Sequence, residues 1–227
     1  MIKYENRIVA FLDILGFKDI ICNKLMDMSQ IGELLKVPYA FSSNPSLHTA
    51  DLLITTLSDS IVMSIRCSKH NAMNKVINMV GSLYGVFLVE YGLMMRGGIA
   101  TGELYHDHQV VFGPALVRAY ELENTRAIYP RVLIDNSDLP SALKSCSPIS
   151  YDCNMELFIM DTDDELYLDT FQYINSGTLS RCQTLLAGMD KSNKHICEKI
   201  EWLEKYIDKK LDMRLNETKN SNSIKAL

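Results

Sequence analysis

The fold is decided by one stretch near the start of the chain, Ile8-Val9-Ala10-Phe11-Leu12-Asp13-Ile14-Leu15-Gly16-Phe17-Lys18. Its first five residues are an uninterrupted apolar run of strand length, which predicts a strand buried on both faces. The run ends in Asp13, after which apolar residues recur at helical spacing, with Gly16 at the junction. An acid at a strand end, beside the free amides of a helix start, can hold a metal ion while the amides hold phosphate. A buried strand whose acid caps the next helix would give the same pattern.

The composition is that of an ordinary globular domain. At 227 residues the chain is long enough for one core, and we expect one domain with a C-terminal extension. Hydrophobic residues make up 47% of it, yet no apolar run reaches the roughly 18 residues that a membrane span needs. The N-terminus is charged and leads straight into the first strand, so we expect neither a membrane span nor a signal peptide.

Charge and cysteine usage narrow the functional class. The formal net charge of −5 argues against a large nucleic-acid surface, which needs clustered Lys and Arg. A small phosphate ligand bound through metal ions is compatible with it. The cysteines are scattered and form no zinc motif, so we expect reduced thiols and a cytoplasmic location. They are Cys22, Cys67, Cys146, Cys153, Cys182 and Cys197.

Periodicity over the first 127 residues predicts alternating helices and strands. We predict a helix over 14–37, either continuous or broken near Ser29, that ends at Pro38. The elements that follow are a loop over 41–50, a hairpin of 52–57 and 61–65, a helix over 69–91 closed by Gly92, a strand over 93–105, a polar turn at 106–108, a strand over 109–112 and a helix over 113–127. This order predicts an α+β fold of the ferredoxin-like or palm type. Its sheet would be rich in antiparallel pairs and covered on one face by helices.

In the remainder of the chain, short apolar runs predict strands at 132–134, 157–160 and 166–168, and an acidic turn joins the last two. An apolar stripe at helical spacing follows, which predicts a helix packed on the domain or on a second subunit. The stripe is Ile196, Ile200, Leu203, Ile207 and Leu211. We therefore expect a main domain over 1–175, a helical extension over 176–216 and a disordered tail over 217–227.

Two acids are the candidate metal ligands, Asp13 at the first strand end and Asp59 in the tip of the first hairpin. In a ferredoxin-like sheet the first strand lies next to this hairpin, so the two carboxylates can converge. Carboxylates so placed can hold two divalent ions about 3.5–4 Å apart, which activate an attacking oxygen and stabilise a leaving one. Because the ligands are hard oxygens, the expected ions are Mg²⁺ or Mn²⁺.

Four successive blocks between residues 8 and 127 resemble those of class III nucleotide cyclases. The blocks are Phe11-Leu12-Asp13-Ile14-Leu15-Gly16-Phe17, Leu57-Ser58-Asp59-Ser60, Arg96-Gly97-Gly98-Ile99-Ala100-Thr101-Gly102 and Phe112-Gly113. The resemblance implies a cyclase-homology fold and a head-to-tail homodimer with active sites at the subunit interface. It implies attack of a ribose 3′-oxygen on the α-phosphorus, with loss of pyrophosphate.

The same resemblance assigns roles to residues of the first two blocks. Asp13 and Asp59 match the metal-binding aspartates, and the backbone carbonyl of Ile14 would also touch metal. The amides that would face the triphosphate are those of Leu15, Gly16 and Phe17.

The sequence departs from the family pattern at the positions that recognise the base and at those that stabilise the transition state. The two positions that read a purine carry Thr55 and Val110, which cannot distinguish adenine or guanine by the usual hydrogen bonds. The asparagine and arginine positions of the following helix carry Val117 and Glu121. Another group must then meet the charge that develops on the phosphate, and the candidates are Arg118 and Arg96.

The variant blocks resemble those of the Pycsar pyrimidine cyclases. These are bacterial anti-phage enzymes that make cyclic UMP or cyclic CMP and signal to a separate effector. The resemblance therefore implies UTP or CTP as the substrate and leaves the choice between them open. It makes Phe11, Thr55 and Tyr120 candidates for the base or ribose pocket.

Other polar clusters in the sequence are weaker candidates for a metal-binding or catalytic site. We interpret His106-Asp107-His108 as a solvated turn and residues 161–165 as a turn, because no calcium-loop glycine or terminal glutamate follows them. Ser58 and Ser60 have no histidine at a suggestive spacing, so they are poor candidates for a nucleophile. Two rival functions stay open: an inactive cyclase-like module that binds nucleotide or a partner, and a palm-type nucleotidyltransferase acting on nucleic acid. The second is disfavoured by the acidic charge and the missing basic stripe.

Overall fold

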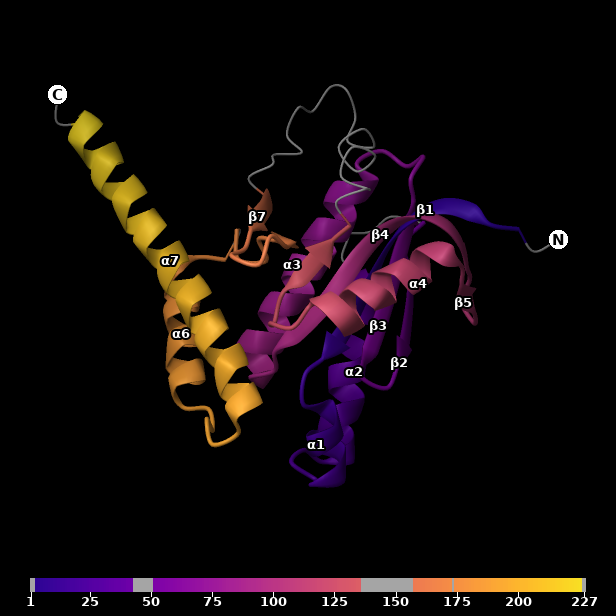
Figure 1. Cartoon of the computed structure of the whole chain (residues 1–227), viewed down its shortest axis with the longest axis horizontal. Coiled ribbons are helices and arrows are strands. Elements are labelled where there is room, and N and C mark those ends of the chain that lie inside the picture. The colour runs from indigo at the N-terminus through magenta and orange to yellow at the C-terminus, as the bar shows by residue number, and fades with distance from the viewer. Residues whose placement is uncertain (1–2, 43–50, 136–156, 173, 226–227) are drawn as a thin grey trace.

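A single sheet organises the protein, whose computed structural model describes residues 3–42, 51–135, 157–172 and 174–225 (Figure 1). The strand order is β2-β3-β1-β4-β6-β8-β7, with β5 paired to β4 outside this path, and β4 and β6 are the parallel pair. The strands are β1 (Glu5–Ile14), β2 (Leu53–Leu57), β3 (Ser60–Arg66), β4 (Met95–His106), β5 (Val111–Phe112), β6 (Val132–Ile134), β7 (Phe158–Met160) and β8 (Leu166–Leu168).

The helices pack on both faces of this sheet. They are α1 (Phe17–Cys22), α2 (Met28–Ser42), α3 (Ala72–Tyr91), α4 (Pro114–Glu121), the π-helix η1 (Leu122–Arg126), α6 (Ser176–Ala187) and α7 (Lys194–Lys225). The larger core joins α3 to one face of β1 through Ile8 and Leu12, whereas Val9 on the other face packs with α4. The α+β class and the antiparallel-rich sheet are confirmed. The prediction of helices on one face alone is wrong, because α4 covers part of the opposite face.

A glycine explains how α4 reaches that second face. A Cβ atom added to Gly98 of β4 would lie 2.3 Å from the backbone oxygen of Ala119 and 2.6 Å from Cβ of Leu122. Only a residue without a side chain therefore lets α4 and η1 rest directly on the β4 backbone.

The segment predicted as a helix over 14–37, continuous or broken near Ser29, forms two helices, α1 and α2. Asp27 and Gln30 exchange hydrogen bonds between side chain and backbone, 2.8 and 2.9 Å long, which form a capping box at the start of α2. Lys24 has a φ of 53°, which breaks the helical path between α1 and α2. Pro38 lies inside α2 and does not end it, because α2 continues to Ser42. The rest of the loop predicted over 41–50 lies outside the described residues.

Most other elements confirm the sequence predictions. The first hairpin is β2 and β3 with Asp59 in its turn, and α3 ends at Gly92, whose φ is 66°. By length and composition α3 is the one helix of the described segments that could cross a membrane, but it forms the buried centre of the larger core. Four cysteines fall in these segments and all are free thiols, whereas Cys146 and Cys153 lie outside them.

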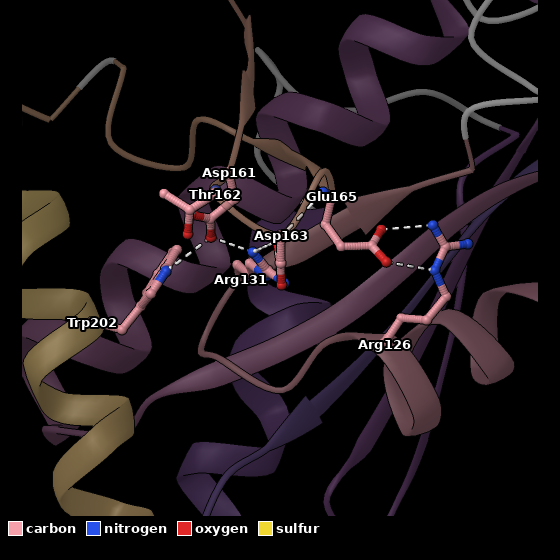
Figure 2. Close-up of polar contacts among 7 residues, drawn as sticks. All are labelled: Arg126, Arg131, Asp161, Thr162, Asp163, Glu165 and Trp202. Carbon is pink, nitrogen blue, oxygen red and sulfur yellow. Dashed lines mark hydrogen bonds and ion pairs between the residues drawn. The ribbon is translucent and has the colours of Figure 1, made fainter.

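The C-terminal helices are fastened to the sheet by a buried arginine. Figure 2 shows Arg131, just before β6, paired with Asp161 and Asp163 of the turn between β7 and β8. Trp202 of α7 donates a hydrogen bond of 2.9 Å to Asp161 from the other side. The acidic turn predicted here is confirmed, and its acids bind the protein's own arginines. Helix α7 continues to Lys225, where we expected a disordered tail.

Candidate active site

The two predicted metal ligands meet at one end of the sheet. Asp13 lies opposite Ser60 of β3, and the amide of Ile14 donates a 3.0 Å hydrogen bond to the backbone oxygen of Asp59. Burial raises the pKa of Asp13, the Arg96 guanidinium opposes this rise, and the negative charge of Asp59 adds to it. The two carboxylates therefore act on each other across the end of β1.

Arg96 and a buried glutamate complete this group of charges. Arg96 lies opposite Asp13 on β4, and its Nε is 3.5 Å from Oδ2 of Asp13 but 2.7 Å from Oε1 of Glu123. The Glu123 side chain is only 4% exposed. Burial raises the pKa of Glu123, Arg96 lowers it, and the charges of Asp13 and Asp59 raise it further. Arg96 therefore bridges two carboxylates: it is hydrogen-bonded to Asp13 and makes a closer ionic contact with Glu123.

Sequence reasoning missed Glu123, although a signal was present. Ala115 and Ala119 are buried against the sheet, and Glu123 follows them at the next step of four residues. A charged residue that continues a buried stripe is unusual and points to an ion pair or a site. Glu123 lies in η1, and π-helical turns inside helices are frequent at functional sites.

The donor set fits a hard divalent cation. Within the described segments no three His, Cys, Asp or Glu side chains lie close enough together to hold a metal by themselves. Mg²⁺ in phosphate-transfer sites is commonly held by one or two carboxylates together with substrate phosphates. Asp13 and Asp59, whose like charges already repel each other, are suited to that arrangement.

The helix start beside these acids contains the three amides predicted to face phosphate, and one of them is already used within the protein. Gly16 caps α1 with a φ of 79°, and its carbonyl accepts bonds from the amides of Asp19 and Ile20. The amide of Leu15 donates a 2.9 Å hydrogen bond to the carbonyl of Met94, so it is already used within the protein. The amides of Gly16 and Phe17 stay predicted phosphate ligands, and Leu15 is removed from that set.

The three base-pocket candidates lie on the α4 side of the sheet. The rings of Phe11 and Tyr120 are 5.5 Å apart, edge to face. Thr55, Val62 and Phe11 are neighbours across three adjacent strands. The structure therefore brings an aromatic pair and a hydroxyl to one surface, with Val62 between them.

His106 is buried, which corrects the prediction of a solvated turn. It is the last residue of β4, and its ring nitrogens lie 3.0 Å from Oγ1 of Thr55 and 2.8 Å from Oγ of Ser64. Ser64 also accepts a 2.8 Å hydrogen bond from the buried Arg7. Thr55 is therefore positioned by a chain of hydrogen-bonded side chains that runs from Arg7 through Ser64 to His106.

Arg118 lies far from Asp13 within one protomer. It donates to the carboxylate of Asp135 at 2.9 and 3.2 Å and to the carbonyl of Thr101 at 3.1 Å. Thr101 is five residues along β4 from Arg96, which corresponds to roughly 16 Å of extended strand. Of the two arginine candidates, only Arg96 therefore lies beside the Asp13 carboxylate of the same chain.

Comparison with known proteins identifies the fold. No protein-family model and no curated protein matches the sequence. The adenylyl cyclase CyaB from P. aeruginosa superposes with a TM-score of 0.50 and 14% identity, covering 74% of this chain and 95% of that one. The monomeric guanylyl cyclase domain of the RhoGC fusion protein from the aquatic fungus Blastocladiella emersonii gives 0.50 and 14%, covering 73% and 94%. The chain therefore has the fold of class III nucleotide cyclase domains.

Proposed function

We propose that this protein is a metal-dependent nucleotide cyclase that converts UTP or CTP to the 3′,5′-cyclic monophosphate and pyrophosphate. The observation that carries the proposal is the meeting of Asp13 and Asp59 at one end of a sheet with the cyclase fold. In this proposal the protein acts in the cytoplasm as an anti-phage signalling enzyme, with no membrane or nucleic-acid partner. Its product would act on a separate effector.

The residues at the end of β1 have distinct roles in this proposal. Asp13, Asp59 and the carbonyl of Ile14 would hold two divalent ions, Mg²⁺ or Mn²⁺, while the amides of Gly16 and Phe17 bind phosphate oxygens. When bound, such ions activate the attacking ribose oxygen and neutralise charge on the leaving pyrophosphate. Arg96 is hydrogen-bonded to one carboxylate oxygen of Asp13 at 3.5 Å and lies closer to Glu123, so the second Asp13 oxygen would remain for a cation.

The remaining groups would come from a second copy of the chain. Arg118 cannot reach the Asp13 of its own protomer, so its proposed contact with the phosphate requires a homodimer with sites between the subunits. Phe11, Thr55 and Tyr120 would face the base, and the exposed Val110 offers no polar group to read a purine. This pairing of a small hydroxyl with apolar side chains supports a pyrimidine substrate.

The test is incubation of the purified protein with each of the four nucleoside triphosphates and Mn²⁺, followed by chromatography of the products. We expect cyclic UMP or cyclic CMP and pyrophosphate, and no product from Asp13→Asn or Asp59→Asn. The matched control is Asp212→Asn, a change to an exposed acid on α7, which should leave the rate unaltered. No cyclic product from any of the four substrates, with or without phage-infected lysate, would refute the proposal.

One observation favours a second candidate, an inactive module that binds nucleotide. Arg118 is bound to Asp135, and the neighbouring helix positions carry Val117 and Glu121. This alternative predicts that the parent protein binds UTP without turnover and that Asp59→Ala leaves the binding intact. Equilibrium dialysis with labelled UTP, run beside the cyclase assay, separates the two functions.

A further inference from the structure

Helix α7 lies beside the candidate active site, although it belongs to the C-terminal extension. Trp202 of α7 stacks on Tyr129, with ring centroids 5.6 Å apart and planes 8° from parallel. Tyr129 immediately precedes Pro130 and Arg131, and the Arg131 carbonyl accepts a 3.1 Å hydrogen bond from the amide of Gly97. This turn of α7 is thus fixed next to the first residues of β4.

Lys199 is three residues before Trp202, so it lies one turn earlier on the same side of α7. It is half-buried. Burial lowers the pKa of Lys199, the nearby Arg96 lowers it further, and the Asp13 carboxylate raises it. The geometry agrees with this: the turn of α7 that carries Lys199 is fixed next to Gly97, whose neighbour Arg96 lies opposite Asp13.

Lys199 is not committed to an internal ion pair. Among the described residues no carboxylate oxygen lies within 4.0 Å of its ammonium group, whereas Arg96 is paired with the buried Glu123. Removing an ammonium group from water without a counter-ion is unfavourable, so this position is suited to an anion from outside the chain.

We propose that Lys199 binds the outer phosphates of the nucleotide and stays bound to the pyrophosphate as it leaves, so that the C-terminal extension contributes directly to the active site. This inference rests on the proposed cyclase function. The bond formed joins the ribose 3′-oxygen to the α-phosphorus, the bond broken joins that phosphorus to the bridging oxygen of the pyrophosphate, and the 3′-hydroxyl proton passes to solvent water. Lys199 keeps its proton throughout and offsets the charge that the leaving group gains.

The direct test is an isothermal titration calorimetry experiment in which inorganic tripolyphosphate is added to the protein in saturating Mg²⁺. We expect Lys199→Met to weaken binding about tenfold, the size of one charge-assisted phosphate contact, and Lys199→Arg to restore most of it. The matched control is Lys205→Met, which removes an exposed lysine of the same helix and should not change the affinity. The KM for the nucleotide should rise in parallel.

A purely structural lysine would give a different result. If Lys199 only balances Asp13 and Glu123, Lys199→Met lowers the melting temperature and leaves the tripolyphosphate affinity unchanged, which overturns the inference. Higher cyclase activity in Lys199→Met would also overturn it. If the parent protein makes no cyclic nucleotide but binds tripolyphosphate through Lys199, the phosphate site stands and the cyclase proposal fails. If the Lys199→Met variant cyclises UTP or CTP as well as the parent protein does, the cyclase proposal stands and the phosphate site fails.

Discussion

Glu123 determines how much of the Arg96 charge reaches Asp13. The guanidinium lies closer to Glu123 than to Asp13, at 2.7 against 3.5 Å, and the Glu123 side chain is almost fully buried. Because Coulomb interactions strengthen with proximity and burial, Glu123 competes strongly with Asp13 for the Arg96 charge, although the Arg96 hydrogen bond goes to Oδ2 of Asp13. The Asp13 carboxylate then keeps lone pairs available for a cation.

We predict that Glu123→Gln weakens the binding of the activating metal ion. With the Glu123 charge removed, Arg96 turns to Asp13 and competes with the cation, so the Mn²⁺ concentration for half-maximal activity should rise about tenfold, equivalent to about 1.4 kcal/mol. Calorimetric Mn²⁺ binding checks the same point without turnover. The control, Glu121→Gln, alters an exposed residue of α4. An unchanged Mn²⁺ requirement would show that Glu123 does not govern Asp13.

His106 makes the stability of the fold depend on pH. Burial lowers the pKa of His106 to about 4, Arg7 and His108 lower it, and Asp107 partly opposes the shift. The unfolded chain, in which histidine has its ordinary pKa of about 6.5, therefore binds more protons between pH 4 and 6.5. The stabilising effect of the neutral imidazole is complete above pH 6.5 and is lost as the pH falls through this window.

We predict that lowering the pH from 7 to 5 reduces the free energy of unfolding by about 2 kcal/mol through His106 alone. Urea denaturation at the two pH values measures the loss, and His106→Gln should remove that part of it. His195→Gln, at an exposed position near the start of α7, provides the comparison. Equal pH dependence in the parent and His106→Gln proteins would assign the effect to other groups.

At the scale of elements, the contact between β4 and the α4–η1 segment sets the position of Glu123. We predict that Gly98→Ala destabilises the protein by about 3 kcal/mol, since the added methyl group would collide with the backbone of Ala119. Gly32→Ala is the control, because a Cβ there meets nothing within 4 Å and alanine favours helix α2 by about 0.5–1 kcal/mol. Similar melting temperatures for the two variants would mean that the contact is loose.

The sequence predicts elements whose signals are local. The apolar run before Asp13, the turn residues around Asp59 and the glycine that ends α3 each act within a few residues, and the structure confirms them. The sequence offers a break near Ser29, and the structure has it a few residues earlier, before the capping box of Asp27 and Gln30. The predicted end at Pro38 is wrong, because α2 continues to Ser42. Local pattern cannot show whether a proline interrupts a helix that tertiary packing supports.

Contacts between distant segments were beyond such patterns. Two histidines at a hairpin turn predict a solvated position for His106, but its partners Thr55 and Ser64 come from other strands. The apolar stripe of α7 predicted a packed helix but not which element it would meet. The sequence therefore predicts that Asp13 and Asp59 converge, and the structure brings them to one end of β1, whereas neither the burial of Glu123 nor the proposed role of Lys199 follows from the sequence.

At the scale of the whole molecule, the distance between Arg118 and Asp13 requires two copies of the chain for one complete site. We predict that mixing Asp59→Asn with Arg118→Ala, each inactive alone, restores about a quarter of the parent activity. Half of the randomly mixed dimers carry both chains, and each of these has one intact site of two. Mixing Asp13→Asn with Asp59→Asn is the control and should restore nothing, because both defects fall on the same side of each site.

The recovery of activity in the mixed variants depends on exchange of subunits between dimers. Size-exclusion chromatography of a mixture of tagged and untagged copies can verify this exchange. Full activity of Arg118→Ala alone would contradict the role of Arg118. No recovery in the exchanged mixture would contradict sites shared between subunits.

The chain has one tryptophan, and the structure places it where it can report on the site. Trp202 has the rings of Tyr129, Tyr167 and Tyr206 within 5.6 Å, and Lys199 is one helical turn away. Its fluorescence emission consequently serves as a built-in optical probe, and the arrival of an anion next to α7 can be followed in real time without attaching any dye.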